Sequence, residues 1–388
     1  MQNHIKPLFL AFFLFGCYAT TDKTGRERAK DDSLSFYPST PDKVNKAEFR
    51  HLYRSVSSFY ESGLGRSAFN GAFLVAKKGE IIYEKYNGNW NIHSGEKIDS
   101  LTSFHMASVS KTFTGMAVMK LWEEGKLGLN DEVSAHLAGF PFAGVTVKTL
   151  LDHRSGLPNY VYFMEQLGWD KKRTVSNADV LQFMIDNKAK LNVGRPDKHF
   201  TYCNTNYALL ALIVEKVSGM AFPQYLQQTF FTPLHMDHTF IFSMDKADQV
   251  LPSFNYRNQK EAFTYLDAVY GDKNVYSTVR DMLKWDQALT LGNLFKPATL
   301  DSAYTGYSNE KPGIKNYGLG WRMYNYPNDK KIIYHNGWWH GNNTFFNRLI
   351  QDSATIIVLG NRFNKSIYQT KKLFPVFSTY EGHADDDE

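Results

Sequence analysis

One stretch of the chain, residues 107–119, limits the possible folds because it carries a single charged side chain. That side chain is Lys111, and Ser108 precedes it by three residues. Residues three apart on a helix lie one turn apart on the same face. A helix that is apolar all round its surface is a buried one. The sequence therefore predicts a buried helix, with a poorly solvated lysine one turn below a serine near its amino end.

Such a pair can serve nucleophilic catalysis. A lysine held away from water loses its proton more readily, and the neutral amine can then accept one. A serine hydroxyl is a weak nucleophile until a base removes its proton. The N–H groups and dipole at a helix amino end stabilise nearby negative charge. The alternative is a helix N-cap and a surface lysine, and the short motif alone favours this alternative because such motifs recur by chance.

Composition predicts a globular protein and argues against nucleic acid as a partner. The 388 residues are 43% hydrophobic and 15% aromatic, which is enough for a large core. The net charge of +5 is mild, and the lysines and arginines are scattered rather than gathered in a run.

The first residues indicate export. Lys6 precedes an apolar run, residues 8–15, which is too short to cross a bilayer, and Gly16-Cys17 follows. A small residue before a cysteine resembles a bacterial lipoprotein cleavage site; an ordinary signal peptide cleaved nearby is the alternative. We expect a signal peptide at 1–16, lipidation of Cys17, and a periplasmic or membrane-anchored lipoprotein of a bacterial envelope. Cys203 would then be the single remaining thiol, so no disulfide framework is expected.

The remaining sequence predicts one α+β domain at residues 47–380, between a polar, flexible tether at 17–46 and an acidic tail at 381–388. A hairpin is predicted over 71–86. Further strands are predicted at 317–324, 331–334, 344–350 and 354–359, and helices at 47–57, 108–125, 145–152, 177–187, 208–218, 278–291 and 366–377. Late strands joined by short turns imply an antiparallel sheet. We expect the hairpin to join that sheet, helices to flank it, and the middle helices to form a lobe.

Acyl transfer by a serine–lysine pair needs a proton carrier and a group that positions the substrate. Tyr202 can carry a proton where nearby positive charge favours its ionised form. Asn204 follows two residues later and can hold a substrate amide or brace Lys111.

Acyl transfer also needs donors for the oxyanion. The N–H groups of Ser108 and Trp338 are expected to supply them. Gly337 would let a substrate approach a strand edge closely, because glycine has no side chain.

Three motifs together resemble a known superfamily. Ser108-Val109-Ser110-Lys111, Tyr202-Cys203-Asn204 and His335-Asn336-Gly337 stand in the order and rough spacing of serine β-lactamases and penicillin-binding proteins. The Tyr-x-Asn form is similar to the class C branch, which also holds family VIII esterases, D-aminopeptidases and DD-peptidases. The resemblance implies a β-lactamase-like (DD-peptidase) fold that needs no cofactor or metal. It also implies roles for four residues: Ser108 as nucleophile, Lys111 as proton acceptor, Tyr202 as proton shuttle and Asn204 as a substrate contact.

The third motif departs from the pattern of this branch. His335 stands where its lactamases carry lysine, and Asn336 replaces a threonine or similar residue. In the family this pair helps to hold the carboxylate of a penicillin or of a D-Ala terminus. We therefore expect uncharged esters or amides to react better than β-lactams. Trp338 and Trp339 suggest an aromatic acyl pocket, or are ordinary strand aromatics.

The sequence thus predicts an exported serine hydrolase that acts on a small-molecule or peptide ester or amide. A β-lactamase or DD-peptidase acting on peptidoglycan-related substrates is the alternative within the same class. A non-catalytic envelope protein that binds or scaffolds is the alternative from another class. His235 and His238 have a spacing that metal ligands can have, but a structural role is favoured because they follow a turn. The oligomeric state is left open.

Overall fold

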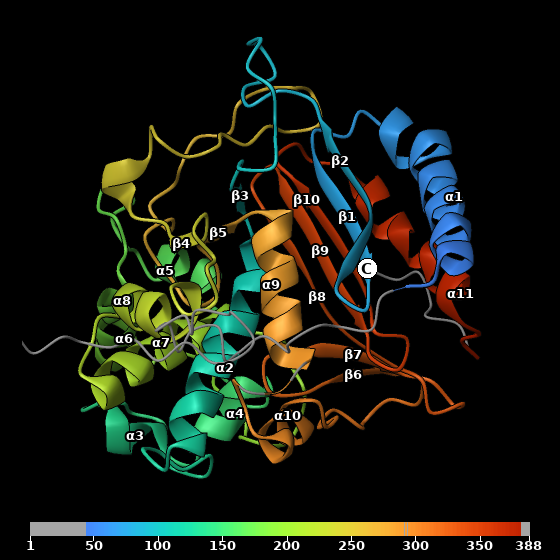
Figure 1. The fold of residues 1–388 in the computed structure, drawn as a ribbon. Helices are drawn as coiled ribbons and strands as arrows, with labels where there is room; N and C mark the ends of the chain where they lie inside the picture. Colours follow the sequence, from blue (N-terminus) through green and yellow to red (C-terminus); the bar gives the residue numbers. More distant parts are fainter. Residues whose placement is uncertain (1–43, 291, 293, 382–388) are drawn as a thin grey trace, which may run out of the picture.

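A seven-stranded antiparallel sheet runs through the protein, in the order β2-β1-β10-β9-β8-β7-β6 (Figure 1). The structure is a computed structural model and describes residues 44–290, 292 and 294–381. The strands are β1 (Gly71–Lys77), β2 (Glu80–Asn87), β6 (Lys315–Tyr317), β7 (Arg322–Asn325), β8 (Lys331–Trp339), β9 (Asn342–Leu349) and β10 (Ala354–Gly360). The amino-terminal hairpin pairs with β10 over the whole of β1, so the prediction that it joins the late strands is confirmed.

The central strands are buried on both faces. Every residue of β10 is buried, as is all of β1 except its last residue. Phe73 and Val75 of β1 point into one core, and Leu74 between them points into the other. Side chains alternate across a strand, so a nearly continuous apolar run is needed where helices cover both faces.

Helix α1 (Lys46–Ser62) covers one face, with η6 (Lys365–Leu373) and α11 (Phe374–Phe377) beside it (Figure 1). The Asn45 side chain caps α1, and Leu52, Val56 and Tyr60 form its buried stripe. The helix predicted at 366–377 is a 3₁₀ helix over most of its length. Pro375 stands in the first turn of α11, where its missing N–H leaves no intrahelical hydrogen bond unmade.

The other face carries α2 and a helical lobe, as predicted (Figure 1). The helices are α2 (Ser110–Glu123), α3 (Val133–His136), α4 (Val147–Leu151), α5 (Tyr160–Gln166), α6 (Asn177–Asp186), α7 (Asn204–Ser218), α8 (Phe222–Leu226), α9 (Val279–Thr290) and α10 (Pro297–Ala303). Shorter elements are the 3₁₀ turns η2 (Leu64–Arg66), η3 (Ala107–Val109) and η5 (Met244–Lys246), the π-helical turn η4 (Gln227–Phe231), and a small sheet of β3 (Phe104–His105), β5 (Val275–Ser277) and β4 (Phe240–Ile241). Residues 110–119 of α2 are all buried, which confirms the predicted central helix.

Ser176 caps α6, in a capping box with Asp179, and Asn177 is buried, with its side-chain amide bonded to the backbone of Ala208 and Tyr270. The strand predicted at 317–324 is two strands, because Gly320 has φ 91° and turns the chain between β6 and β7. That turn packs directly on α2: a Cβ on Gly320 would lie 3.2 Å from the Cα of Gly115.

The export signal at 1–16, Cys17, most of the tether and the tail from residue 382 lie outside the described residues. Within the residues described, no helix is both long and apolar enough to span a membrane.

Candidate active site

Ser108 and Lys111 lie in contact at the start of the buried helix. Ala107, with φ 46°, turns the chain between β3 and η3, and its N–H donates to His105 Nδ1 at 3.1 Å. An alanine in the left-handed backbone conformation is uncommon. Here it precedes Ser108, which lines a cleft. Lys111 Nζ lies 3.1 Å from Ser108 Oγ and donates to the Asp272 carbonyl at 2.7 Å. Lys111 is fully buried, so its side chain has the poorly solvated position that the sequence predicted.

Tyr202 and Asn204 reach the same cleft from the start of α7. Lys111 Nζ lies 5.1 Å from the centre of the Tyr202 ring. Among the described residues, the buried Tyr202 Oη has no hydrogen-bond partner, so its capacity to donate or accept a hydrogen bond is unused. The side-chain oxygen of Asn204, Oδ1, also has no hydrogen-bond partner among the described residues, so it does not bond Lys111. Of its two predicted roles, holding a substrate amide fits this position better than bracing the lysine.

The end of β8 forms a third wall of the cleft. The β7 ladder ends at the pair Arg322↔Tyr334, so β8 extends beyond the last residue that pairs with β7. Gly337 lies in this part of β8 and packs against the turn that carries the nucleophile: a Cβ there would lie 2.6 Å from the Met106 carbonyl oxygen and 2.9 Å from the Ala107 Cβ. Close packing of strand and turn therefore requires this glycine, apart from any approach of substrate.

His335 lies behind the cleft wall rather than in the cleft. It is fully buried, with Nδ1 2.7 Å from the Asn336 carbonyl oxygen and Nε2 3.3 Å from Tyr317 Oη. Burial above all, and then the cations of Arg322 and Lys111, hold its pKa well below its ordinary range. The imidazole is therefore neutral and has no direct path to a substrate. Asn336, predicted beside it as a substrate contact, does line the cleft.

Arg322 is a charged residue of the cleft that the sequence did not single out, and Glu165 and Glu261 line the cleft as well. It is the first residue of β7, it lines the cleft, and its guanidinium carbon lies 5.0 Å from the centre of the Tyr202 ring. The single strand predicted at 317–324 did not reveal the turn that precedes Arg322. The side-chain cationic groups of Arg322 and Lys111 thus both lie close to the Tyr202 ring.

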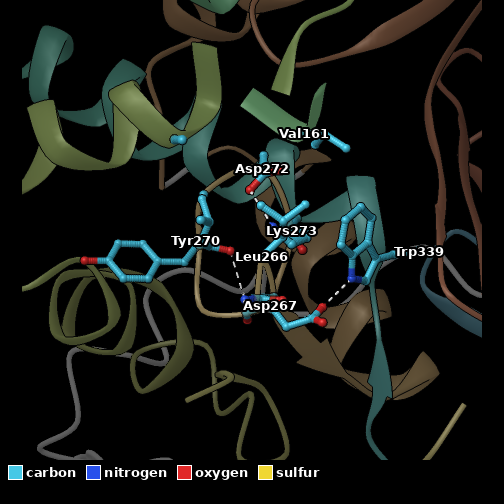
Figure 2. A network of polar contacts seen from close by, with 12 residues as sticks. Val161, Leu266, Asp267, Tyr270, Asp272, Lys273 and Trp339 are labelled. Carbon is cyan, nitrogen blue, oxygen red and sulfur yellow. Dashed lines mark hydrogen bonds and ion pairs between the residues drawn. The ribbon is translucent and has the colours of Figure 1, made fainter. Parts of the chain in front are cut away.

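Trp338 and Trp339 both line the cleft, whose volume is about 1150 Å³. Trp338 is 64% exposed. The Trp339 indole N–H donates to Asp267 Oδ1 at 2.5 Å, and Figure 2 shows this bond below the ring. Burial opposes a charge on Asp267, but hydrogen bonds from His340, the Thr264 N–H and Trp339 hold its pKa to about 2. The indole is thus fixed to a carboxylate that stays ionised.

A second buried lysine, Lys273, lies beneath the Trp339 ring, with Nζ 4.8 Å from the ring centre (Figure 2). Its ammonium bonds Tyr160 Oη at 2.5 Å and pairs with Asp272 Oδ1 at 3.5 Å. Burial lowers the pKa of Lys273, while the Asp272 and Asp267 carboxylates oppose that change. Asp272 therefore contacts both lysines, Lys273 through its carboxylate and Lys111 through its backbone carbonyl.

One cleft brings together most of the predicted site residues. It is lined by Ser108, Tyr202, Asn204, Asn336, Gly337 and Trp338, and Lys111 lies beneath it. Over the described ranges, no group of three or more histidine, cysteine or acidic side chains is arranged to hold a metal.

A serine beside a buried lysine, with a tyrosine within reach in an open cleft, is the arrangement of a serine acyl hydrolase. Residues 57–372 match the Beta-lactamase family, and the chain belongs to it. Penicillin-binding protein 4* of Bacillus subtilis (strain 168) is 31% identical over 333 residues, which is 81% of this chain and 73% of that protein. The chain spans 61% and 62% of the length of two further relatives.

Two solved structures share the fold. The octameric penicillin-binding protein homologue of Pyrococcus abyssi has a TM-score of 0.71 at 23% identity, over 84% of this chain and 78% of its own. EstCE1, described as a hydrolase with promiscuous acyltransferase activity, has a TM-score of 0.71 at 19% identity, over 86% of this chain and all of its own. The expected α+β, β-lactamase-like fold is confirmed.

Proposed function

We propose that the chain is an exported serine hydrolase that cleaves an ester or amide bond through an acyl-enzyme at Ser108. One observation carries the proposal: Lys111 Nζ lies 3.1 Å from Ser108 Oγ, where that serine faces the cleft. A lysine in contact with a hydroxyl, and shielded from water, is placed to act as its base.

The reaction follows from the positions of these groups. The neutral Lys111 amine accepts the hydroxyl proton as Ser108 Oγ bonds to the substrate carbonyl carbon. The carbonyl electron pair moves to oxygen, where the N–H groups of Ser108 and Trp338 stabilise it. Tyr202 then donates its proton to the leaving atom, that bond breaks, and the Lys111 ammonium returns a proton to Tyr202. Water attacks the acyl-enzyme by the reverse route and frees the acid.

A fluorophosphonate probe tests this mechanism. It should modify Ser108, and Ser108→Ala should lose both the adduct and the hydrolysis of a p-nitrophenyl ester. Ser110→Ala is the matched control from the same motif, since the buried Ser110 hydroxyl accepts from the Val275 N–H. An adduct elsewhere, or hydrolysis that survives Ser108→Ala, would contradict the mechanism. A folded wild type with neither activity would favour the non-catalytic binding or scaffolding alternative.

A specific observation favours a second candidate, a β-lactamase or DD-peptidase. Of the described residues that line the cleft, Arg322 is the one lysine or arginine, and a guanidinium binds a carboxylate well. A 31%-identical relative is named a penicillin-binding protein. A chromogenic cephalosporin and a D-amino-acid amide, measured beside the ester, decide between the candidates.

Export and a lipid anchor at Cys17 complete the proposal, on the strength of the apolar run before Gly16-Cys17. Expressed in a bacterium, the protein should partition with membranes and carry a diacylglyceryl group at Cys17, and Cys17→Ser should lack it. Wild-type protein cleaved at another bond and recovered entirely in the soluble fraction would refute the anchor.

A further inference from the structure

The segment His153-Arg-Ser-Gly-Leu-Pro158 has no part in the mechanism above, yet its first residue lies directly against Tyr202. His153 is fully buried, and its backbone has φ 58°. Its imidazole centre lies 4.4 Å from the centre of the Tyr202 ring, with the two planes tilted by 43°. A histidine in the left-handed backbone conformation is uncommon, and the contacts of His153 show what holds it there.

His153 holds the chain on both sides of Tyr202. Its backbone carbonyl accepts from the Thr201 N–H at 2.9 Å. Its Nδ1 accepts from the Cys203 N–H at 3.1 Å. His153 therefore accepts hydrogen bonds from the backbone N–H groups on both sides of Tyr202. Its imidazole packs against the Tyr202 ring.

A second set of bonds fixes which imidazole nitrogen carries the proton. The Ser155 hydroxyl donates to Asn206 Oδ1 at 2.7 Å, which leaves the Asn206 Nδ2 to face His153 Nδ1 at 3.3 Å. Nδ1 thus meets two donors and must be an acceptor, so the proton is on Nε2. Burial, and then the nearby Lys111 cation, hold the pKa of His153 well below its ordinary range.

Tyr202 does not fix its own orientation by its hydroxyl, since Oη has no hydrogen-bond partner among the described residues. Its direction is set by the backbone and by the rings against it. We propose that His153 is a positioning residue. It orients the Tyr202 hydroxyl toward the leaving-group atom of the substrate that Ser108 attacks. This inference rests on the proposed function, in which Tyr202 gives that atom its proton.

The choice of leaving group separates positioning from general damage. A p-nitrophenolate leaves without a proton, whereas an alkoxide from an ethyl ester needs one. Proton transfer of this kind contributes roughly 10²–10⁴-fold to a rate. We therefore expect Tyr202→Phe and His153→Leu each to lose at least about tenfold in kcat/KM on an ethyl ester, but less than about threefold in kcat/KM on the p-nitrophenyl ester of the same acid. This quantity reports acylation, the step in which the leaving group differs.

Three further variants complete the experiment. His153→Asn keeps an acceptor near the Nδ1 position and should recover most of the ethyl-ester activity. Asn206→Asp is nearly isosteric and turns the donor at Nδ1 into an acceptor; it should show the same selective loss even where His153→Leu fails to fold. His235→Leu is the backbone control, because His235 has φ 53° in a turn distant in sequence from all three motifs. It should alter stability without changing the ratio of the two rates.

Equal losses on both esters in His153→Leu and Asn206→Asp, in protein that still reacts with the fluorophosphonate, would overturn the inference. So would an unselective loss in Tyr202→Phe. Hydrolysis that persists in Ser108→Ala would instead refute the proposed function itself, so the two failures are distinguishable.

Discussion

Replacing Arg322 with glutamine should change which leaving groups the cleft accepts. Arg322 lines the cleft, and its guanidinium lies 5.0 Å from the ring of Tyr202, the residue proposed to serve the leaving atom. We therefore expect the positive charge of Arg322 to interact with the leaving-group part of the substrate. His335 cannot supply that charge, because it is buried and its pKa is held well below its ordinary range.

The magnitude follows from one charge-assisted hydrogen bond. Losing such a bond costs about 1.5–3 kcal/mol, which is roughly one to two powers of ten in rate when the bond acts in the transition state. The assay compares kcat/KM for the 3-carboxyphenyl and 3-methylphenyl esters of one acid. Arg322→Gln should lower the ratio of the two values by about 10–100-fold. Any effect of Arg322 on Tyr202 acts on both esters and cancels in the ratio.

Lys315→Gln is the matched control for net charge. Lys315 lines a neighbouring hollow that Arg322 also borders, but it does not line the cleft. An unchanged ratio in Arg322→Gln, or an equal fall in Lys315→Gln, would refute direct recognition of the carboxylate. A wild-type preference for the 3-carboxyphenyl ester would reverse the expectation drawn from His335 and Asn336 alone, that neutral substrates react best.

Two further predictions concern stability. His335→Lys should not create a carboxylate site; it should bury an uncompensated ammonium near Arg322 and Lys111, and thermal or urea unfolding should show a loss of about 3–5 kcal/mol. Asp267 has a folded-state pKa of about 2, below its unfolded value, so its contribution is present above pH 4 and is lost as the pH falls through 2. It amounts to about 2 kcal/mol, and the difference in unfolding free energy between wild type and Asp267→Asn should shrink between pH 6 and pH 3; a difference independent of pH would contradict this.

The sequence predicted those features that depend on local pattern. A single lysine in an otherwise uncharged stretch was sufficient to predict the buried helix and the contact of Lys111 with Ser108. Alternation and turn residues predicted the hairpin, and its apolar first strand agrees with a position between two other strands, β2 and β10. These features follow from periodicity and burial, which the order of residues records directly.

Partnerships between distant segments were not predictable in the same way. Arg322 enters the cleft because a glycine turn separates β6 from β7, and a single strand had been expected there. Lys273 has no pattern that distinguishes it from a surface lysine until Tyr160 and Trp339 are placed around it. His153 likewise carries no pattern that links it to Tyr202, and only the fold brings its imidazole against that ring, about fifty residues later in the chain.

The contact between Gly115 and Gly320 ties the nucleophile to the recognition of substrate. A Cβ on Gly115 would lie 3.0 Å from the Gly320 Cα, so backbone meets backbone where α2 passes the turn before Arg322. The spacing between the serine and the arginine is therefore a property of the main chain. Descendants of this protein can exchange the aromatic side chains of the cleft and acquire new substrates. The distance between the carbonyl that Ser108 attacks and an anion bound by Arg322 should stay almost unchanged.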